Sequence, residues 1–271
     1  VEKVPAMVKN YRKLDLDCLF VLGGNGSTKT ANRLREEGLN VIALPKTIDN
    51  DTYGTDMTFG FPSAIDIATK CIDDIHTTAD SHRRVFVIEI MGHKVGWIPL
   101  YAGIAGGADV ILIPEIPYEM DNVIDAIEQR ERDGGRFSIV VVAEGAITKE
   151  EAAMKKKDYK RLVAQRVKPS VAYDIAEEIA ARTDREVRVA VPGHTQRGGE
   201  PSAQDRIFAT QCGVEAAKSC LAGEYGCMIA LRDGRMTRVP LKEVAGKLKY
   251  VDPSSELVRE AKMLGISFGD E

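Results

Sequence analysis

The sequence lacks the marks of a secreted, zinc-binding or membrane-spanning protein. Its cysteines number five, an odd count, and form no CxxC pair, so we expect reduced thiols in a cytoplasmic protein rather than disulfides or a zinc site. The chain does not open on a charged-then-apolar leader, and no secretory signal is expected. The most apolar stretch, residues 97–117, is interrupted by Pro99, Gly106 and Asp109, which argues against a membrane span.

An excess of positive charge is also missing. The 271 residues carry 41 acidic and 37 basic side chains, a formal net charge of −4, which argues against nucleic acid as the main partner. Apolar residues make up 44% of the chain, enough for a substantial core, and this excludes a mainly disordered protein. The length predicts one large domain or two modest ones.

Short apolar runs alternate with helical patterns along most of the chain. We expect strands at 18–22, 40–44, 84–89, 110–113, 138–143 and 186–191, and helices at 28–38, 64–79, 99–106, 120–133, 170–183 and 202–222. This rhythm predicts an α/β protein with mainly parallel sheets covered by helices on both faces. The basic run between Lys155 and Arg161 is interpreted as a solvated helix or inserted loop, with docking of an anion as the alternative.

Two loops at the ends of the first two predicted strands carry candidate chemistry. Residues 23–27 have the sequence GGNGS and precede a predicted helix, an arrangement that favours an anion but also serves simply to turn the chain. It matches neither the Walker nor the GxGxxG pattern. Residues 45–51, PKTIDND, supply a cation, a hydroxyl and two carboxylates. Ligands of open α/β sheets bind at the carboxyl ends of strands, although an Asx-rich turn is also common there.

Further motifs follow in a distinctive order. They are MGH at 91–93, PE at 114–115, AE at 143–144 and GHTQRGG at 193–199. With GGNGS and PKTIDND, the chain from Leu16 onward resembles the phosphofructokinase family. The resemblance implies two doubly wound, mainly parallel α/β domains with the active site in the cleft between them. Residues 1–61 with 198–250 would bind the phosphoryl donor, and residues 62–197 with 251–271 would bind the sugar phosphate.

The resemblance also implies roles for residues of the two loops. Asp49 would be the general base that takes the proton from the 1-hydroxyl of fructose 6-phosphate, and Thr47 and Asp51 would hold the reacting phosphoryl group and its Mg²⁺. The implied donor-binding residues are Gly24, Asn25, Gly26, Ser27 and Lys46, and the implied metal ligands are Asn25 and Asp51. The family usually has aspartate at the position of Asn25, so weaker Mg²⁺ binding is expected.

A second group of residues would hold the sugar phosphate. Met91, Gly92 and His93 would lie against the sugar, Glu144 would bond its hydroxyls, and His194, Arg197, Arg84 and Arg188 would grip the 6-phosphate. In the family the last two reach in from a neighbouring subunit, which implies a homodimer or homotetramer with shared sites. The family usually has arginine where this chain has His93, so the contact of that position with the donor phosphate shifts to Lys94 or weakens. Four of these residues also have an ordinary alternative: a surface salt bridge for Arg84 and Arg188, a loop cap for Glu144, and a loop histidine for His194.

The phosphoryl donor is predicted from two positions. In the family the residue after Asn25 is glycine in ATP-dependent members, where the nucleotide needs the space, and aspartate in pyrophosphate-dependent ones, so Gly26 favours ATP. Lys46 is shared by pyrophosphate enzymes and some ATP-dependent relatives. The steric argument outranks the charge argument, so we predict a glycolytic ATP-dependent enzyme, with pyrophosphate as the alternative. The family's first strand and glycine loop have no counterpart before Val1, so a fragment, or a catalytically weak sugar-phosphate-binding relative, is a further alternative. An NAD or lipid kinase is disfavoured by PKTIDND and GHTQRGG together.

Overall fold

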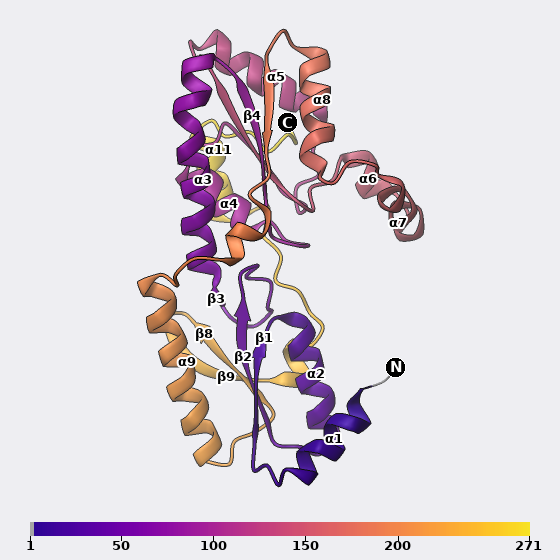
Figure 1. The fold of residues 1–271 in the computed structure, drawn as a ribbon, viewed down its shortest axis with the longest axis vertical. Helices are drawn as coiled ribbons and strands as arrows, with labels where there is room; N and C mark the ends of the chain where they lie inside the picture. Colours follow the sequence, from indigo (N-terminus) through magenta and orange to yellow (C-terminus); the bar gives the residue numbers. More distant parts are fainter. Residues whose placement is uncertain (1–2) are drawn as a thin grey trace. The chain divides into compact units, whose positions relative to one another are not determined.

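The computed structural model describes residues 3–271, and Val1, which enters the expectation of a fragment, lies outside the described residues. The chain divides into two compact units. Unit 1 comprises Val1–Ser63 and Glu200–Lys249, and unit 2 comprises Ala64–Gly199 and Tyr250–Glu271 (Figure 1). The donor-binding and sugar-binding roles assigned to the two parts of the chain remain predictions.

Unit 1 is built on a five-stranded sheet. Strands β1 (Leu19–Gly23), β2 (Val41–Thr47), β8 (Cys227–Arg232) and β9 (Arg235–Pro240) lie in this order, and β3 (Phe59–Gly60) pairs with β2. All pairs are parallel except β8 with β9.

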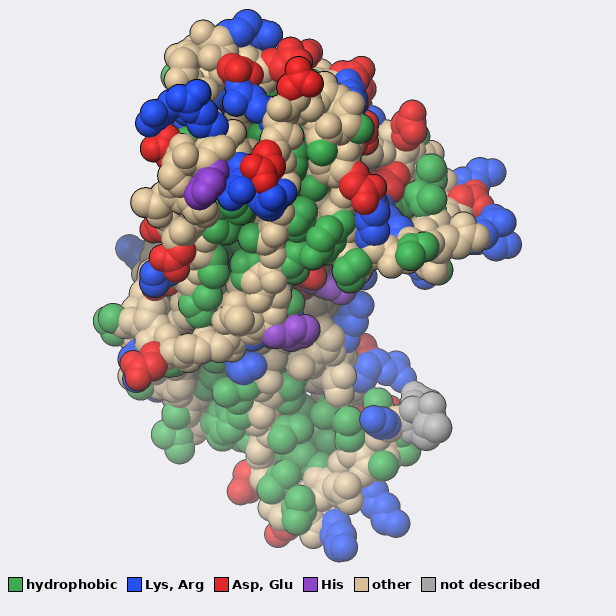
Figure 2. Space-filling model, turned by 45° about the horizontal axis from the view of Figure 1, so that its top comes forward, with side chains coloured by type: hydrophobic (Ala, Val, Ile, Leu, Met, Phe, Trp, Pro, Cys, Tyr) green, Lys and Arg blue, Asp and Glu red, His purple; other side chains and the backbone are tan. Residues whose placement is uncertain are grey.

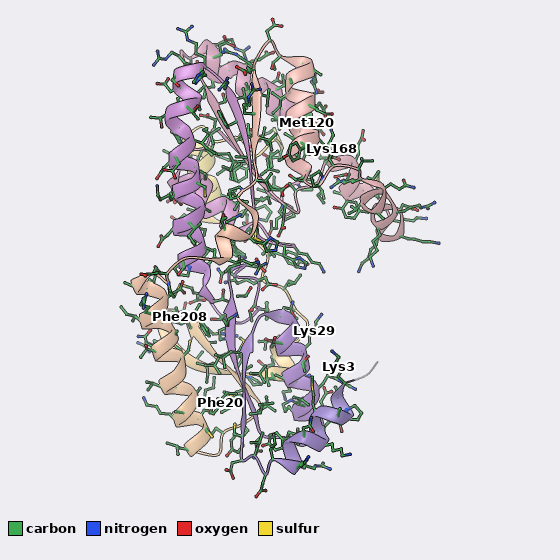
Figure 3. The ribbon with its side chains drawn as sticks, viewed as in Figure 1. Lys3, Phe20, Lys29, Met120, Lys168 and Phe208 are labelled. Carbon is green, nitrogen blue, oxygen red and sulfur yellow. The ribbon has the colours of Figure 1, made fainter. Side chains whose placement is uncertain are left out.

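Helices cover both faces of the unit 1 sheet because side chains alternate along each strand. Helices α1 (Val4–Lys13), α2 (Asn25–Glu36) and α10 (Leu241–Val244) pack on the face that carries Val41 and Ala43. Helix α9 (Ala203–Leu221) covers the face of Ile42 and Leu44 with Phe208, labelled in Figure 3, and Cys212.

Unit 2 contains a four-stranded parallel sheet in the order β5 (Val110–Leu112), β6 (Ser138–Ala143), β4 (Val85–Ile90) and β7 (Val187–Ala190). Its two central strands are buried almost throughout, as expected for parallel strands covered on both faces. Helices α5 (Met120–Arg132) and α8 (Val171–Arg182) form a core with one face, and α4 (Trp97–Ala105) contacts β5 and β6. The remaining helices are α3 (Phe61–His82), α6 (Lys149–Ala153), α7 (Lys156–Gln165), α11 (Glu256–Met263) and the 3₁₀ helix η1 (Gly193–Arg197).

The structure differs from the sequence predictions in its strands and in the start of one helix. The hairpin of β8 and β9 was not predicted, and α2 begins at Asn25 rather than near Thr28. Cys18 and Cys71, which lie within apolar patterns of the sequence, are half-buried, and all five cysteines are free thiols. Residues 147–168 form α6 and α7, which have no buried residue, and Figure 2 shows Lys and Arg side chains over this projecting segment. None of the described helices is long and apolar enough to span a bilayer.

Candidate active site

The GGNGS segment joins β1 to α2, with less loop than the sequence suggested. Gly24 is the N-cap of α2, so Asn25, Gly26 and Ser27 form the first helical turn. The first N–H groups of a helix have no partner within it and carry partial positive charge. A Cβ added at Gly24 would lie 3.2 Å from the Thr47 Cβ, whereas one at Gly26 would meet nothing within 4 Å. Gly24 therefore permits close approach of the second loop, and Gly26 faces open space.

Asn25 is held by Lys247, a residue of unit 1 that lies 222 positions further along the sequence. Its Nδ2 donates a hydrogen bond of 3.2 Å to the carbonyl oxygen of Lys247. Its Oδ1 is buried and has no hydrogen-bond partner among the described residues. Buried polar atoms are normally paired, so this oxygen is a candidate ligand for a cation or a bound water.

The second loop leaves β2 beside the first, because Gly23 and Pro45 are partners in the parallel ladder. Thr47 Oγ1 accepts the N–H of Asp49 at 3.2 Å and donates to Asp49 Oδ2 at 3.4 Å. The Thr58 hydroxyl donates to the Thr47 carbonyl oxygen at 2.8 Å. The predicted catalytic and donor-binding residues of unit 1 thus lie at one edge of its sheet, with Lys46 exposed on β2.

Between the two carboxylates of this loop, Asn50 adopts a left-handed conformation with φ of 53°. Its Oδ1 accepts bonds from the Thr58 N–H at 3.1 Å and from Lys249 Nζ at 2.9 Å. The Lys249 N–H also donates to the carbonyl oxygen of buried Asp51 at 2.9 Å. Burial lowers the pKa of Lys249 to about 8, opposed by the charges of Asp56 and Asp51.

Sequence reasoning missed Lys249. The residue lies about 200 positions from Asn50 and belongs to no motif, so no local signal marks it.

In unit 2 the MGH segment and Glu144 follow neighbouring strands, since Ile90 and Ala143 are partners in the ladder. Glu144 Oε1 accepts the N–H of Gly92 at 3.1 Å and that of His93 at 2.6 Å. His93 has φ of 56°, and a Cβ at Gly92 would lie 2.4 Å from the Val95 carbonyl oxygen. The carboxylate and the close chain packing together fix the shape of this turn.

Gln196 links the same turn to the GHTQRGG segment. Its Oε1 accepts the Met91 N–H at 3.1 Å, and its Nε2 donates to the Gly193 carbonyl oxygen at 3.2 Å. Gln196 is 1% exposed, whereas His194 and Arg197 on either side of it are exposed. The structure therefore brings the segment that carries His194 and Arg197 next to the Met91 turn through Gln196. The sequence assigned no role to Gln196.

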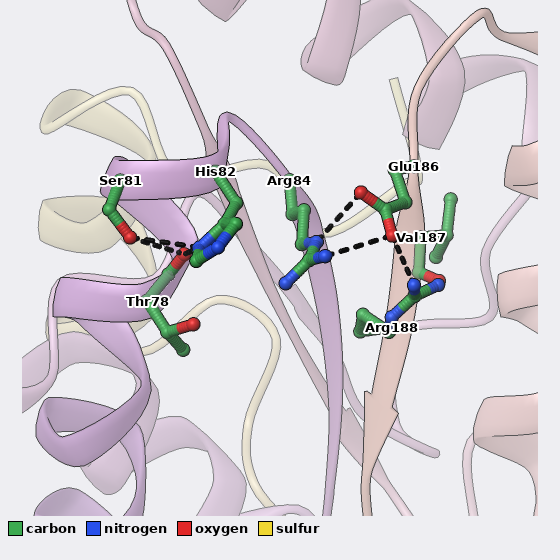
Figure 4. Close-up of polar contacts among 7 residues, drawn as sticks. All are labelled: Thr78, Ser81, His82, Arg84, Glu186, Val187 and Arg188. Carbon is green, nitrogen blue, oxygen red and sulfur yellow. Dashed lines mark hydrogen bonds and ion pairs between the residues drawn. The ribbon is translucent and has the colours of Figure 1, made fainter.

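Arg84 and Arg188 lie elsewhere in unit 2, at the amino ends of β4 and β7. Figure 4 shows both around Glu186, to which Arg84 donates at 2.8 and 3.0 Å and Arg188 also donates. The Arg84 hydrogen bond, helped by the charge of Arg188, lowers the pKa of Glu186. The six residues of β4 separate Arg84 from Met91 by about 20 Å. Within unit 2, this arginine pair is not part of the Met91–Glu144 site.

The comparisons with known proteins decide the family. Residues 1–220 match the family model described as phosphofructokinase. This chain belongs to the phosphofructokinase family. The resemblance predicted from the motifs is confirmed.

Two curated relatives cover nearly all of the chain. An ATP-dependent 6-phosphofructokinase of Spirochaeta thermophila is 54% identical over 99% of this chain and 73% of its own length. ATP-dependent 6-phosphofructokinase 3 of Bacteroides thetaiotaomicron is 46% identical over 99% of this chain and 75% of its own length.

Solved structures of the family confirm the α/β fold with mainly parallel sheets. Phosphofructokinase of Pichia pastoris in the T-state is similar, with a TM-score of 0.74 and 36% identity over 88% of this chain and 28% of that one. A pyrophosphate-dependent phosphofructokinase of Marinobacter aquaeolei gives a TM-score of 0.77 at 25% identity, over 98% of this chain and 71% of that one.

A divalent metal fits the family's kinase chemistry. Among residues 3–271, no three His, Cys, Asp or Glu side chains gather into a cluster that would hold a metal by themselves. Mg²⁺ at phosphoryl-transfer sites is held by one or two protein oxygens together with waters and substrate phosphates, so such a cluster is not required. The buried Oδ1 of Asn25 is a suitable oxygen for this kind of site.

Proposed function

We propose that this phosphofructokinase transfers a phosphoryl group from ATP to the 1-hydroxyl of fructose 6-phosphate, giving fructose 1,6-bisphosphate in glycolysis. The observation that carries the proposal is the 54% identity, over 99% of the chain, to a relative named ATP-dependent 6-phosphofructokinase. The open space at Gly26 supports a nucleotide donor. We place the enzyme in the cytoplasm, in keeping with its free thiols.

Asp49 is the proposed general base. The N–H of Asp49 is anchored on Thr47 Oγ1, and this contact holds the carboxylate beside the carboxyl end of β2, where it takes the proton from the attacking hydroxyl. Gly24, Asn25, Gly26, Ser27 and Lys46 bind the donor phosphates, largely through the N-terminus of α2. Asn25 and Asp51 hold Mg²⁺, which neutralises charge on the phosphates when bound.

The residues of unit 2 bind the sugar phosphate. Met91, Gly92 and His93, shaped by Glu144, lie against the sugar, and His194 and Arg197 bind its 6-phosphate. Arg84 and Arg188 serve the site of a neighbouring copy in a homodimer or homotetramer. Their distance from Met91 along β4 supports this arrangement, because within one unit 2 they cannot reach the ligand that Met91 contacts.

Pyrophosphate is the second candidate donor, favoured by Lys46 and by the likeness to the Marinobacter aquaeolei structure. A coupled assay of fructose 1,6-bisphosphate formation with Mg²⁺ and either donor separates the two. We expect turnover with ATP and none with pyrophosphate, and an Asp49→Asn variant with kcat lowered about 10²- to 10⁴-fold. Turnover with pyrophosphate alone contradicts the ATP proposal, and turnover with neither donor contradicts the function.

A further inference from the structure

We infer that Lys249 is a positioning residue for phosphoryl transfer, which holds the Asp49–Asp51 turn in its reactive shape through the side chain of Asn50. The inference rests on the proposed function for its consequence in catalysis. Its structural part, that Lys249 holds this turn, stands on contacts within unit 1.

Lys249 donates four hydrogen bonds to the turn and the residues after it, three from its ammonium group and one from its backbone N–H. Lys249 Nζ donates to Asn50 Oδ1 at 2.9 Å, to the Thr55 carbonyl oxygen at 3.0 Å and to the Asp56 carbonyl oxygen at 2.8 Å. The ammonium group thus ties the side chain at the centre of the catalytic loop to the backbone that follows it. Its backbone N–H adds the bond to the Asp51 carbonyl oxygen.

These hydrogen bonds hold Asn50 in its backbone conformation. A left-handed conformation is unfavourable for most residues other than glycine, and asparagine tolerates it better than most, helped by hydrogen bonds of its short side chain. Asn50 Oδ1 has two such bonds, one from Thr58 N–H and one from Lys249 Nζ. Because Asn50 separates Asp49 from Asp51, a change in its backbone angles would move the two carboxylates relative to each other.

The same segment also reaches the donor loop. The carbonyl oxygen of Lys247 accepts Asn25 Nδ2, and Leu248 forms an isolated bridge with Thr52. Residues 247–249 therefore connect the first turn of α2 with the turn that carries Asp49. Misplacement of reacting groups by about 1 Å can cost about 10²-fold in rate, so loss of this connection should lower kcat more than substrate affinity.

The first measurement is hydrogen exchange by mass spectrometry on peptides covering residues 47–56. Lys249→Met replaces the ammonium with an unbranched apolar group, and Asn50→Gly keeps the left-handed backbone while removing the acceptor. Lys242→Met, at an exposed position on α10, is the matched control. We expect faster exchange in both test variants and wild-type exchange in the control. Wild-type exchange in a folded Lys249→Met variant overturns the inference.

The second measurement is steady-state kinetics of the same variants and of the double variant. We expect kcat with ATP to fall about 100-fold in Lys249→Met, with KM for fructose 6-phosphate changed less than about threefold. If Lys249 acts through Asn50, the double variant should be no slower than the slower single variant. Additive losses overturn the positioning role, as does an unchanged kcat.

Two further outcomes keep the inference testable, one if a variant does not fold and one if the proposed function fails. If Lys249→Met does not fold, Asn50→Gly decides, and wild-type exchange and kcat in that variant overturn the inference. If the wild-type chain has no activity with ATP, the proposed function fails, and the exchange measurement still decides whether Lys249 holds the turn.

Discussion

Glu144 accepts the backbone N–H of His93 at 2.6 Å, which joins the turns that follow two adjacent strands of unit 2. The same carboxylate oxygen accepts the N–H of Gly92. A side chain that the motifs predict to bond the sugar therefore also shapes the MGH turn. Its substitution tests both roles together.

Replacing Glu144 by alanine should raise KM for fructose 6-phosphate about 10- to 100-fold. Both N–H groups lose a charged acceptor, a loss worth about 1.5–3 kcal/mol. Glu144→Gln keeps a neutral acceptor and should have a smaller effect. Steady-state kinetics checks the order of the two variants, with Glu150→Ala, at an exposed position on α6, as control. Equal effects of Gln and Ala would show that the turn does not depend on this acceptor.

Arg188→Ala should also raise KM for fructose 6-phosphate by about 10- to 100-fold, since a charge-assisted contact to the 6-phosphate is lost. Arg182→Ala, at the exposed end of α8 where Arg182 pairs with Asp121, is the control. An unaffected KM in Arg188→Ala would count against a phosphate-binding role.

Mixing Arg188→Ala with Asp49→Asn tests whether the site is shared between copies, when activity is assayed at fructose 6-phosphate well below the raised KM of Arg188→Ala. If Arg188 serves the neighbour's Asp49, unfolding and refolding Arg188→Ala with Asp49→Asn makes hybrids with one intact site. Random pairing of dimers should recover about a quarter of wild-type activity. No recovery from a mixture that contains hybrids would place both residues in the site of one copy.

The periodic parts of the fold were predictable because their signals are local. Buried parallel strands such as 138–143 are continuous apolar runs, and helices such as α5 show an amphipathic repeat. The β8–β9 hairpin could also have been predicted, because Asp-Gly is a standard pair for a two-residue hairpin turn. In the structure Asp233 and Gly234 both have the positive φ that such a turn requires.

The residues that hold the candidate site in place could not be predicted in the same way. Asp49, Glu144 and His194 stand in motifs, but the contacts from Lys249 and Gln196 depend on residues that only folding brings together.

Glu115→Gln should change how stability depends on pH. Glu115 Oε1 accepts the N–H groups of Gly96 and Val251, each at 3.0 Å, while burial raises the pKa of this carboxyl above its ordinary value near 4.5. A raised folded-state pKa gives stability at low pH that is lost as the pH rises through that pKa. Glutamine keeps an acceptor for both bonds and cannot ionise.

The Tm difference, Glu115→Gln minus wild type, should therefore grow as the pH rises above the ordinary carboxyl pKa near 4.5. Thermal unfolding at a series of pH values measures it, with Glu119→Gln, at an exposed position, as control. A difference that stays constant with pH would contradict the raised pKa.

Asn25→Asp should strengthen Mg²⁺ binding and weaken the fold. A carboxylate in place of the amide adds a charge at the candidate metal oxygen, and acidic oxygens are the ligands that Mg²⁺ prefers. Aspartate cannot donate to the Lys247 carbonyl oxygen, so that bond is lost and two oxygens face each other, at a cost of about 1–3 kcal/mol.

Titration of activity with Mg²⁺ should show a lower half-saturating concentration, while thermal unfolding without metal should show a lower Tm. Asn25→Ala loses the same bond without adding charge, so it should share the lower Tm but not the tighter Mg²⁺ binding. A half-saturating concentration equal to that of the wild type in Asn25→Asp would remove Asn25 from the metal site and leave it only its contact with Lys247.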